Sequence, residues 1–491
     1  KIVDVFDFAT SRQYDKMYST LVSIQELSSP SKAKCLMHKQ FQKKYGNHLT
    51  TLERLLNVFK PEDKNFMSQV TSWCQTVQSL LREDLNSIKM IQLSAVCPEL
   101  YDKTHFYLAI PGTYRPNKPV IRIEYFVGQF SVYASKQQPK DVVIKGEDGN
   151  FYQYLLKGHE DLRLDERIMQ FFRMINSFLR KEACFNANVI QIISVIPLSV
   201  AHGLVQWVPG TETMRNIIEN QRKKHGFDPM LEYSLCDDYG CYYTPYDYLR
   251  PIQKMQLLER VFKETSDSDI ADSFWLMAPS AEQWLKKIDT FSITTAITSA
   301  VGYIIGLGDR HPSNLLIDTV TGKVVHIDFG DCFEKAALRK YLPEVVPFRL
   351  TRMMVKAMGA VGVDGIFMTS FVNMLNLLCE NNRVLIMVLS IFVHEPLVDP
   401  EDQTAQEILL SKATTTGSIV DKGRVFIAES SLEKTVSSSV EMRKRVSQKL
   451  NGNDPDIGLH LNVEEQASRL IQAATDTYHL SKMYSGWCPF W

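Results

Sequence analysis

The spacing of apolar residues changes twice along this chain, and these changes restrict the folds that it can adopt. In residues 1–90 apolar side chains recur every three or four positions, which is typical of amphipathic helices, and beyond about residue 210 the chain is again predicted to be mostly helical. Between these regions, from about Leu108, short β-type runs alternate with turns that contain Gly and Pro. The sequence therefore predicts an α+β protein in which one β-rich region separates two helical regions.

Residues 1–90 are predicted to form three helices, because three apolar faces are separated by polar loops at residues 28–31 and 60–63. Helices joined by short loops favour a small antiparallel bundle. The three faces consist of Met17, Leu21, Ile24 and Leu27, then of Phe41, Tyr45, Leu49, Leu52, Leu56 and Phe59, and finally of Phe66, Val70, Trp73, Val77 and Leu80.

The β-rich region is predicted to hold strands at residues 120–125, 130–134, 151–156 and 189–197. An amphipathic helix, with Ile168, Phe171, Phe172, Ile175, Phe178 and Leu179 on its apolar side, lies between the last two. Residues 203–209 are predicted to be the crossover into the second helical region, which extends to about Pro396.

Composition excludes several classes of protein. The 491 residues suffice for about three domains, and 45% hydrophobic with 23% charged residues is typical of a folded chain. A formal net charge of −1 supplies no overall basic field, so direct nucleic-acid binding is not expected and any anion site must be local. Nine cysteines, without a Cys-x-x-Cys pair, indicate a reducing compartment and argue against a zinc site.

Neither a signal peptide nor a membrane span is predicted. The first residues lack a basic stretch followed by an apolar one. Residues 291–308 are uncharged but diluted by hydroxyl side chains, and the apolar run 384–393 is about half the length that a bilayer requires. Both segments are predicted to be buried core helices.

Candidate catalytic residues are concentrated in one short stretch. The loop Gly-Leu-Gly-Asp-Arg-His-Pro-Ser-Asn, residues 306–314, precedes a predicted hairpin and the sequence Asp-Phe-Gly at 328–330. Protein kinases place a base Asp five residues before a metal-binding Asn, and then a hairpin and an Asp-Phe-Gly. Asp309 and Asn314 have that spacing, although His311 follows the Asp instead of preceding it. Two unrelated surface turns are the other interpretation, and the correct separation of both motifs disfavours it.

Phosphoryl transfer requires residues of these types. Its transition state spreads negative charge over oxygen atoms, so catalysis consists mainly of positioning and electrostatic stabilisation. Asn314 and Asp328 supply oxygen ligands for Mg²⁺ or Mn²⁺. Asp309 is predicted to accept or orient the proton of the substrate hydroxyl, and His311 to donate to the γ-phosphate of ATP.

Residues that could bind the phosphates of ATP lie in the β-rich region. A phosphate-binding lysine is expected after a strand, and Lys157 follows the strand predicted at 151–156. Glu160 and Asp165 are the acids that could hold it. No glycine-rich loop is present, and the turn that begins at Ser135 is the candidate replacement.

These motifs resemble the phosphoinositide-3-kinase-related protein kinases, and among them the kinase-containing C-terminal part of the target-of-rapamycin (TOR) kinases. The matching segments are residues 111–114, 157–167, 306–314, 328–334, 347–352 and 486–491, the last of which reads Gly-Trp-Cys-Pro-Phe-Trp. The resemblance covers nearly the whole chain and implies a two-lobed fold of the phosphoinositide 3-kinase type. The implied parts are an FRB-like bundle (1–90), a kinase N-lobe (91–209), a C-lobe (210–399), a partly mobile linker (400–457) and a FATC segment (458–491).

The resemblance also implies roles for individual residues. Lys157 is similar to the ATP lysine of the family and Asp165 to the acid beside it. Trp207 and Val208 match the adenine-stacking and hinge positions of the family. Leu316 and Ile327 match the residues that form the floor of its ATP pocket.

The chain departs from the family pattern at several positions. Ile193 replaces an aromatic residue and Gln206 replaces the Gly before the hinge Trp, so different inhibitors are expected to fit. Ser481 and Met483 replace two cysteines that the family often carries, which leaves Cys488 without a nearby disulfide partner.

Three functions compete: a protein kinase, a lipid kinase and a catalytically dead scaffold. The resemblance implies the first, an atypical protein Ser/Thr kinase that controls cell growth in response to nutrients. A lipid kinase shares the reversed catalytic loop but needs a strongly basic activation segment, whereas the three basic residues of residues 334–347 are offset by Glu334 and Glu344. A catalytically dead scaffold would have lost some of the catalytic residues, and all are present here.

Partners are implied by the resemblance as well. They are protein substrates, scaffold subunits of the Raptor or Rictor type, and a WD40-propeller subunit on residues 213–263, where the excursion at 233–248 is longer than a connection within a lobe needs. The implied location is cytoplasmic, including the surface of endomembranes.

Binding of a rapamycin–immunophilin complex is expected to be weak or absent. An ungapped alignment places Thr71, Gln75 and Gln78 where the family has groove aromatics, and Val5 at about the position of a groove Ser. Trp73 is expected to face the bundle core. At the other end of the chain, the aromatic residues of 484–491 are expected to be buried against the C-lobe.

Overall fold

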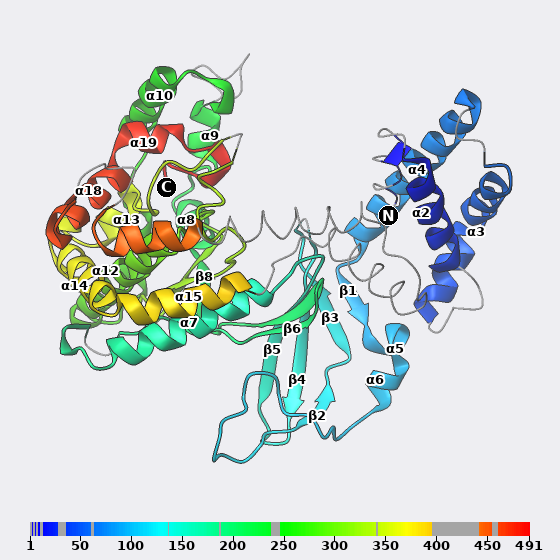
Figure 1. Cartoon of the computed structure of the whole chain (residues 1–491), viewed down its shortest axis with the longest axis horizontal. Coiled ribbons are helices and arrows are strands. Elements are labelled where there is room, and N and C mark those ends of the chain that lie inside the picture. Colours follow the sequence, from blue (N-terminus) through cyan, green and yellow to red (C-terminus); the bar gives the residue numbers. More distant parts are fainter. Residues whose placement is uncertain are drawn as a thin grey trace, which may run out of the picture. The chain divides into compact units, whose positions relative to one another are not determined.

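The computed structural model describes residues 2, 5, 8–9, 13–27, 36–59, 63–135, 137–185, 188–236, 246–339, 342–394, 441–453 and 460–491. They belong to two compact units (Figure 1). The first unit contains residues 1–162 and 194–207, and the second contains residues 163–193 and 208–491.

The first unit begins with the three predicted helices, α2 (Tyr14–Leu27), α3 (Leu36–Asn57) and α4 (Lys64–Ser87). Helix α3 contacts both α2 and α4. Their shared core includes Met17, Leu52, Val70, Trp73 and Val77. The loop predicted at 28–31 and most of the loop at 60–63 lie outside the described residues.

One residue that was predicted to lie in the bundle core is exposed. Leu80 of α4 is 37% exposed. One turn further along α4, Asp84 accepts a hydrogen bond from the hydroxyl of Tyr45 and forms an ion pair with Lys44. Polar contacts therefore close this end of the bundle, where the periodic pattern predicted apolar packing.

The rest of the first unit is built around an antiparallel sheet, in which the order of strands is β1-β3-β4-β5-β7-β6 and β2 pairs with β4. Short helices α5 (Leu93–Val96) and α6 (Pro98–Asp102) follow β1. The strands are β1 (Met90–Gln92), β2 (Ile123–Phe126), β3 (Gln129–Val132), β4 (Lys140–Gly146), β5 (Phe151–Gly158), β6 (Val195–Ser199) and β7 (His202–Gln206).

Three strand predictions need correction. Strand β4 was not among those predicted. Residues 189–194 form no strand, because both backbone groups of Ile190 are bonded to the side chain of Asn176, at 2.8 Å each. Residues 203–206 belong to β7 and not to a crossover, because they pair with β5 and β6.

The second unit is mainly helical. Its one described sheet, of order β10-β9-β8, has three short strands, β8 (Thr211–Thr213), β9 (Leu315–Asp318) and β10 (Val324–His326). Helices α7 and α15 contact each other along this unit (Figure 1). The helices before residue 400 are α7 (Arg163–Leu179), α8 (Met214–Lys224), α9 (Leu231–Cys236), α10 (Pro251–Glu264), α11 (Asp269–Met277), α12 (Ala281–Ile304), α13 (Arg352–Ala357), α14 (Ile366–Glu380) and α15 (Asn382–His394).

Helix α12 forms the centre of the second unit's core. Its residues from Phe291 to Ile304 are all buried, and it packs against α14. The hydroxyls of Ser292 and Thr298 donate to carbonyls four residues earlier, so these two polar side chains are satisfied within the helix. The prediction of a buried core helix here is confirmed, and none of the described helices is long and apolar enough to cross a membrane.

The C-terminal residues form two helices and a buried tip. Helices α18 (Val463–Thr475) and α19 (Thr477–Lys482) pack against α14 and α10 respectively. Trp487, Phe490 and Trp491 are each at most 2% exposed, which confirms the predicted burial of the aromatic tip. Most of the predicted linker lies outside the described residues, and within its described part residues 441–450 form a helix.

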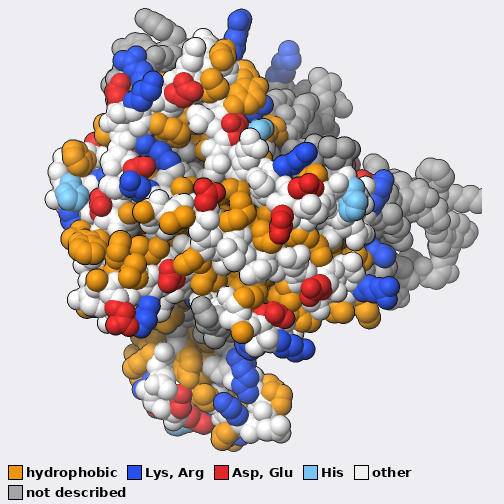
Figure 2. Space-filling view, turned by 90° about the vertical axis from the view of Figure 1, so that its left-hand side faces the viewer, with side chains coloured by type: hydrophobic (Ala, Val, Ile, Leu, Met, Phe, Trp, Pro, Cys, Tyr) orange, Lys and Arg blue, Asp and Glu red, His pale blue; other side chains and the backbone are white. Residues whose placement is uncertain are grey.

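Charged side chains are mixed on the surface. Figure 2 shows one face of the molecule, on which Lys and Arg alternate with Asp and Glu and apolar side chains lie between them. This face has no single basic area, in agreement with the net charge of −1.

Candidate active site

The loop at residues 306–314 leaves the end of α12 and leads into β9. Its first turn requires glycine, because Gly306 has φ +57° and a Cβ there would lie 2.6 Å from the backbone N of Glu334. Arg310, which is 3% exposed, fixes the rest of the loop. Its guanidinium donates to Gly308 O (2.8 Å), to Ile327 O (2.7 Å) and to Asp328 O. One buried side chain thus connects residues 306–314, called the catalytic loop below for their predicted role, to the Asp-Phe-Gly segment.

Asp309 is held by contacts on every side. It has φ +57°, an uncommon conformation for a non-glycine residue. Its N–H donates to Glu344 Oε1 (2.9 Å), and its C=O accepts from the side-chain amide of Asn314 (2.8 Å). Its Oδ1 accepts from the hydroxyl of Tyr484 (2.8 Å), and its Oδ2 lies 4.0 Å from Nε2 of His311.

His311 is oriented toward Asp309 in a defined tautomer. Its Nδ1 accepts a hydrogen bond from Ser313 N (3.2 Å), so the ring hydrogen of the neutral form is on Nε2. Burial lowers the pKa of His311, the charge of Asp309 opposes this effect, and Arg310, Arg349 and Arg215 lower the pKa further. The neutral imidazole is therefore favoured, with an N–H donor on the side of the Asp309 carboxylate.

Asn314 and Asp328 offer oxygen atoms to a divalent cation. The amide nitrogen of Asn314 is used by Asp309 O, which leaves the amide oxygen as its ligand atom. Asp328 has φ +61° and its Oδ1 accepts from Gly330 N at 3.4 Å. One amide and one carboxylate fit Mg²⁺, which usually binds one or two protein oxygens together with substrate phosphates and water. No group of three or more His, Cys, Asp or Glu suited to a metal occurs among the described residues.

The Asp-Phe-Gly segment is anchored to α7. Phe329 N donates to Asp165 Oδ1 (3.2 Å), and the ring of Phe329 packs edge-on against Phe172 at 5.4 Å. Asp165, predicted as an acid of the ATP site, therefore also fixes the backbone next to Asp328.

The other predicted ATP-site residues are divided between the two units. In the first unit, Lys157 at the end of β5 forms an ion pair with Glu160 (3.2 Å), and Ser135 lies in the turn between β3 and β4. The ring of Trp207 stacks on Tyr133, with 6.0 Å between ring centroids. The second unit contains Val208 before β8, Leu316 in β9, and Ile327 directly after β10.

Two residues near Asp309 were missed as site residues. Glu344 is 8% exposed. Burial raises the pKa of its carboxyl group to about 7, although the hydrogen bond from Asp309 N opposes the shift. Tyr484 comes from the C-terminal segment, 175 residues after Asp309. The aromatic tip was noticed in the sequence, but nothing in its pattern indicated a contact with the catalytic loop.

Arg349 holds the C-terminal tip in place. It is 3% exposed and donates to Trp487 O (2.6 Å), Cys488 O (2.8 Å) and Trp491 O (2.9 Å). It also donates to Arg310 O of the catalytic loop (3.3 Å). The same guanidinium thus connects the end of the chain with the catalytic loop.

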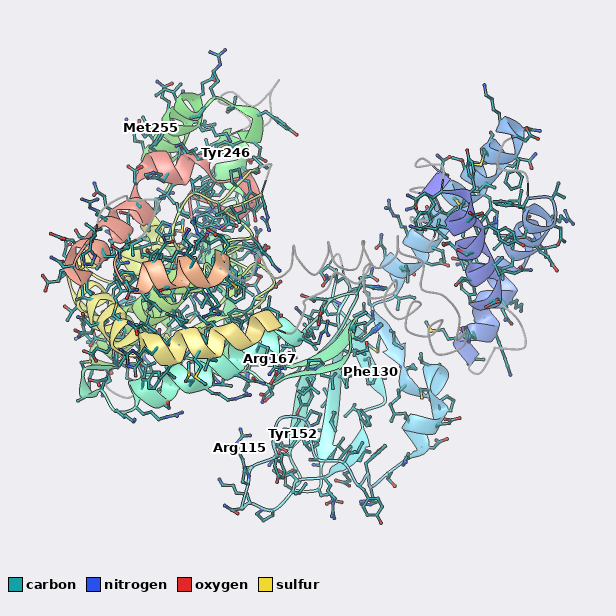
Figure 3. All side chains as sticks on the ribbon, in the orientation of Figure 1. Arg115, Phe130, Tyr152, Arg167, Tyr246 and Met255 are labelled. Carbon is teal, nitrogen blue, oxygen red and sulfur yellow. The ribbon has the colours of Figure 1, made fainter. Side chains whose placement is uncertain are left out.

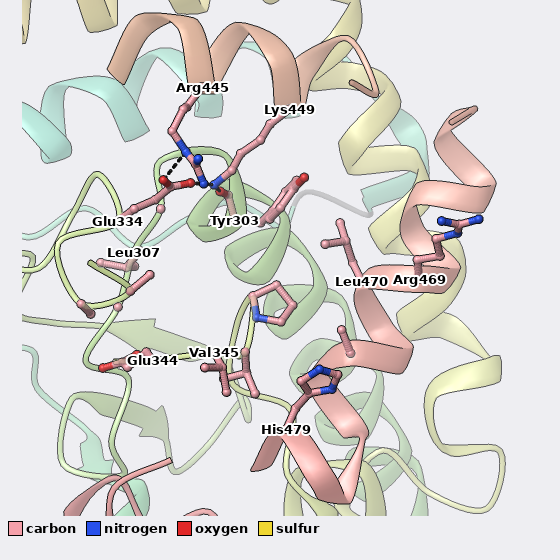
Figure 4. Close-up of a pocket in the computed structure, with 17 residues that line it drawn as sticks. Tyr303, Leu307, Glu334, Glu344, Val345, Arg445, Lys449, Arg469, Leu470 and His479 are labelled. Carbon is pink, nitrogen blue, oxygen red and sulfur yellow. Dashed lines mark hydrogen bonds and ion pairs between the residues drawn. The ribbon is translucent and has the colours of Figure 1, made fainter. Parts of the chain in front are cut away.

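A cavity of about 320 Å³ lies behind the catalytic loop (Figure 4). Gly308 and Glu344 line it on the side of the loop, and Leu470 and His479 line it on the C-terminal side. At its rim Glu334 pairs with Arg445 and, at 2.7 Å, with Lys449. These pairs connect the 441–450 helix to the segment after Asp-Phe-Gly.

Comparison with known proteins gives two matching family models. "Phosphatidylinositol 3- and 4-kinase" matches residues 151–401 and "FATC domain" matches residues 460–491. The serine/threonine-protein kinase tor1 of Schizosaccharomyces pombe is 39% identical over 84% of this chain and 18% of its own length. The serine/threonine-protein kinase TOR2 of Saccharomyces cerevisiae is 36% identical over 97% of this chain and 20% of its own length. The chain thus spans about a fifth of the length of these curated relatives.

A solved structure shares the fold. The FAT and kinase domain of CtTel1 superimposes with a TM-score of 0.62, at 24% identity, over 79% of this chain and 25% of that chain. At this level of identity the similarity concerns the fold alone, and it agrees with the predicted phosphoinositide 3-kinase type of architecture.

Proposed function

Because this chain belongs to the phosphatidylinositol 3- and 4-kinase family, we propose that it is an atypical serine/threonine protein kinase of the TOR type. The reaction is transfer of the γ-phosphate of ATP to Ser and Thr hydroxyls of proteins. The observation that carries the proposal is the grouping of Asp309, His311 and Asn314 on one loop that Arg310 connects to Asp328. The similarity to two kinases named TOR favours protein over lipid as the substrate.

The geometry suits a direct transfer. The substrate oxygen forms a bond to the γ-phosphorus while its proton passes to Oδ2 of Asp309, and the bond from the γ-phosphorus to the bridging oxygen breaks, so that ADP leaves with the electron pair. The Nε2–H of His311 donates to an oxygen of the transferred group. Asn314 and Asp328 would hold Mg²⁺ or Mn²⁺, which when bound neutralises charge on the phosphate oxygens.

The proposal assigns ATP contacts to residues of both units. Lys157 would bind phosphate oxygens, with Glu160 and Asp165 as the acids that orient it. The remaining assignments are Ser135 for the phosphates, Trp207 and Val208 for adenine, and Leu316 and Ile327 for the pocket floor.

A lipid kinase is the second candidate, since the matching family model is named for phosphatidylinositol kinases. Two basic groups of the activation segment are already engaged within the protein. Lys335 donates to Gly330 O (3.4 Å), and Arg339 pairs with Asp331. The carboxylate of Asp331 offsets the charge of Arg339, so the segment offers little net positive charge to an inositol phosphate, which favours a protein substrate.

The test is transfer of labelled γ-phosphate to a protein substrate and to phosphatidylinositol, with wild type and Asp328→Ala side by side. We expect the wild type to label protein and the variant to label neither. Labelling of phosphatidylinositol alone would assign the chain to the lipid kinases.

For partners, we propose a WD40-propeller subunit on residues 213–263 and scaffold subunits of the Raptor or Rictor type. In that segment Phe227, Tyr248 and Ile252 are 61%, 81% and 55% exposed, which suits an interface. Tyr233 and Tyr246, by contrast, contact the C-terminal segment of this chain. Residues 237–245 lie outside the described residues. A pulldown in which the intact chain retains no propeller subunit would contradict this assignment.

The proposed parts of the chain are the FRB-like bundle, the N-lobe, the C-lobe, the linker and the FATC segment, with the boundaries expected from the sequence. A cytoplasmic location, including the surface of endomembranes, is proposed with them. Imaging of the tagged full chain against endomembrane markers tests the location.

A further inference from the structure

We infer that Tyr484 is a positioning residue for Asp309, so that the C-terminal segment completes the active site. The inference rests on the proposed function, because it assumes that Asp309 accepts the substrate proton. It adds to the site a residue from the C-terminal segment. It also assigns Oδ1 of Asp309 to Tyr484 and Oδ2 to the side that faces His311.

The contacts of the Asp309 carboxylate carry the inference. Oδ1 accepts from the Tyr484 hydroxyl at 2.8 Å, whereas Oδ2 lies 4.0 Å from His311 Nε2. The backbone of the same residue is fixed by Glu344 and Asn314. Rotation about the side-chain bonds is the freedom that these backbone contacts leave, and the Tyr484 bond removes it. Oδ2 is then directed to the place where the imidazole and the substrate hydroxyl meet.

Tyr484 is itself held firmly. The following residue, Ser485, donates its N–H and its hydroxyl to the carboxylate of Asp247, at 2.8 and 3.1 Å. Trp487 N donates to Tyr484 O at 3.0 Å, and Arg349 binds Trp487 O. Burial raises the pKa of Tyr484 well above its ordinary value, and the charge of Asp309 raises it further. The phenol therefore remains a hydrogen-bond donor at any working pH.

The opposite role would be inhibition. A tyrosine hydroxyl on the base could imitate the substrate hydroxyl and block it. The geometry favours positioning, because Tyr484 uses Oδ1 and leaves the oxygen that is near His311. The two roles predict opposite changes in kcat when the hydroxyl is removed.

The experiment compares Tyr484→Phe with Tyr246→Phe in the full chain. Tyr246, labelled in Figure 3, is the matched control, since its hydroxyl also donates to the C-terminal segment, at Ser481 O (2.8 Å), and not to Asp309. For Tyr484→Phe we expect kcat to fall by roughly tenfold to a hundredfold, as for loss of a hydrogen bond to a charged group, with KM for ATP unchanged. Both variants should have the same thermal midpoint, and Tyr246→Phe should keep the wild-type kcat.

A double variant tests whether Tyr484 acts through Asp309. In Asp309→Asn, adding Tyr484→Phe should cause little further loss of the residual activity. Independent, multiplicative losses would overturn the inference, as would an unchanged or increased kcat in Tyr484→Phe, or a thermal midpoint below that of Tyr246→Phe. If the wild type transfers phosphate to no substrate, both the proposed function and this inference are wrong. An active wild type with an equally active Tyr484→Phe overturns the inference alone.

Discussion

At the scale of single residues, the site depends on positions whose backbone conformation is unfavourable by itself. Asp309 and Asp328 both have positive φ, which non-glycine residues seldom adopt. Hydrogen bonds from Arg310, Asn314 and Tyr484 hold them there. Because these contacts are shared, the residues of the loop are expected to act as a unit.

The first prediction concerns the joint action of Asp309, Asn314 and Asp328. Asp309→Ala, Asn314→Ala and Asp328→Ala should each lower kcat by several orders of magnitude, because each removes a proton acceptor or ligand from a site that gathers charge. The combined variants should lose little more than the single ones. Single-turnover assays measure this, with Val320→Ala in the hairpin turn, 78% exposed, as an active control. Near-normal turnover of Asp309→Ala with ATP still bound would contradict the role of Asp309.

Glu344 gives a pH-dependent prediction. Burial raises the pKa of this carboxyl group from 4.5 to about 7, with repulsion from Asp309 adding to the shift. Between these two values the unfolded chain loses the proton that the folded chain keeps, so stability falls as the pH rises from about 4.5 to 7 and is flat above. The shift corresponds to roughly 3 kcal/mol.

Glu344→Gln should remove this loss of stability, because glutamine stays neutral and its oxygen can still accept from Asp309 N. The thermal midpoint of the variant should therefore rise relative to wild type between pH 4.5 and 7. Scans of both proteins across this range measure the difference. A constant difference at every pH would show that Glu344 does not titrate there.

At the scale of elements, the C-terminal tip behaves as part of the core of the second unit. Trp487 is 1% exposed and lies against Arg349, whose guanidinium is 4.3 Å from the centre of the ring. A segment that ends in several large rings would otherwise expose an apolar patch. The tip is thus both packing material and, through Arg349 and Tyr484, a support of the catalytic loop.

Trp487→Ala should therefore destabilise the protein by about 3–5 kcal/mol and also lower activity. Trp275→Ala is the matched control, because Trp275 is 58% exposed and should change stability by less than about 0.5 kcal/mol. Denaturant unfolding and phosphotransfer assays of both variants measure the effects. A Trp487→Ala protein as stable and active as the control would refute the packing role.

The bundle gives a prediction about ligand binding. Trp73 is 6% exposed in the core, and its Nε1–H donates to His48 O at 2.9 Å. It is therefore turned away from the surface that carries Gln75, as the ungapped alignment expects. Each large apolar side chain that a polar residue replaces in the groove lowers the hydrophobic contribution to binding by on the order of 1.5–3 kcal/mol. Titration of the full chain with rapamycin and its immunophilin should show weak or no binding, and nanomolar affinity would refute this inference.

At the scale of the whole molecule, metal should be needed for catalysis and not for folding. No cluster of three or more His, Cys, Asp or Glu suited to a structural metal occurs in the described part of the chain, and the pair Asn314 and Asp328 needs phosphate oxygens to complete a site. A chelator should abolish phosphotransfer and leave the thermal midpoint unchanged. Added Mg²⁺ or Mn²⁺ should restore activity, and a midpoint lowered by the chelator would indicate a structural metal.

The sequence by itself determined most of the helices and the spacing of the candidate catalytic residues. Helical spacing predicted α2, α3, α4 and α7, because an apolar stripe along one side of a helix is visible in the sequence and has to face a core. The catalytic motif was recognisable because its Asp and Asn lie five residues apart on one loop, and the Asp-Phe-Gly is a hairpin away.

Only the tertiary structure decided which distant residues meet. Ile190 lies in an apolar run that reads as a strand, yet Asn176 satisfies its backbone, and no local pattern encodes that choice. Glu344 and Tyr484 reach Asp309 across 35 and 175 residues, so their roles depend on how the chain returns to the loop. Spacing within a sequence reports contacts along one helix or strand, whereas contacts between segments depend on packing of the whole core.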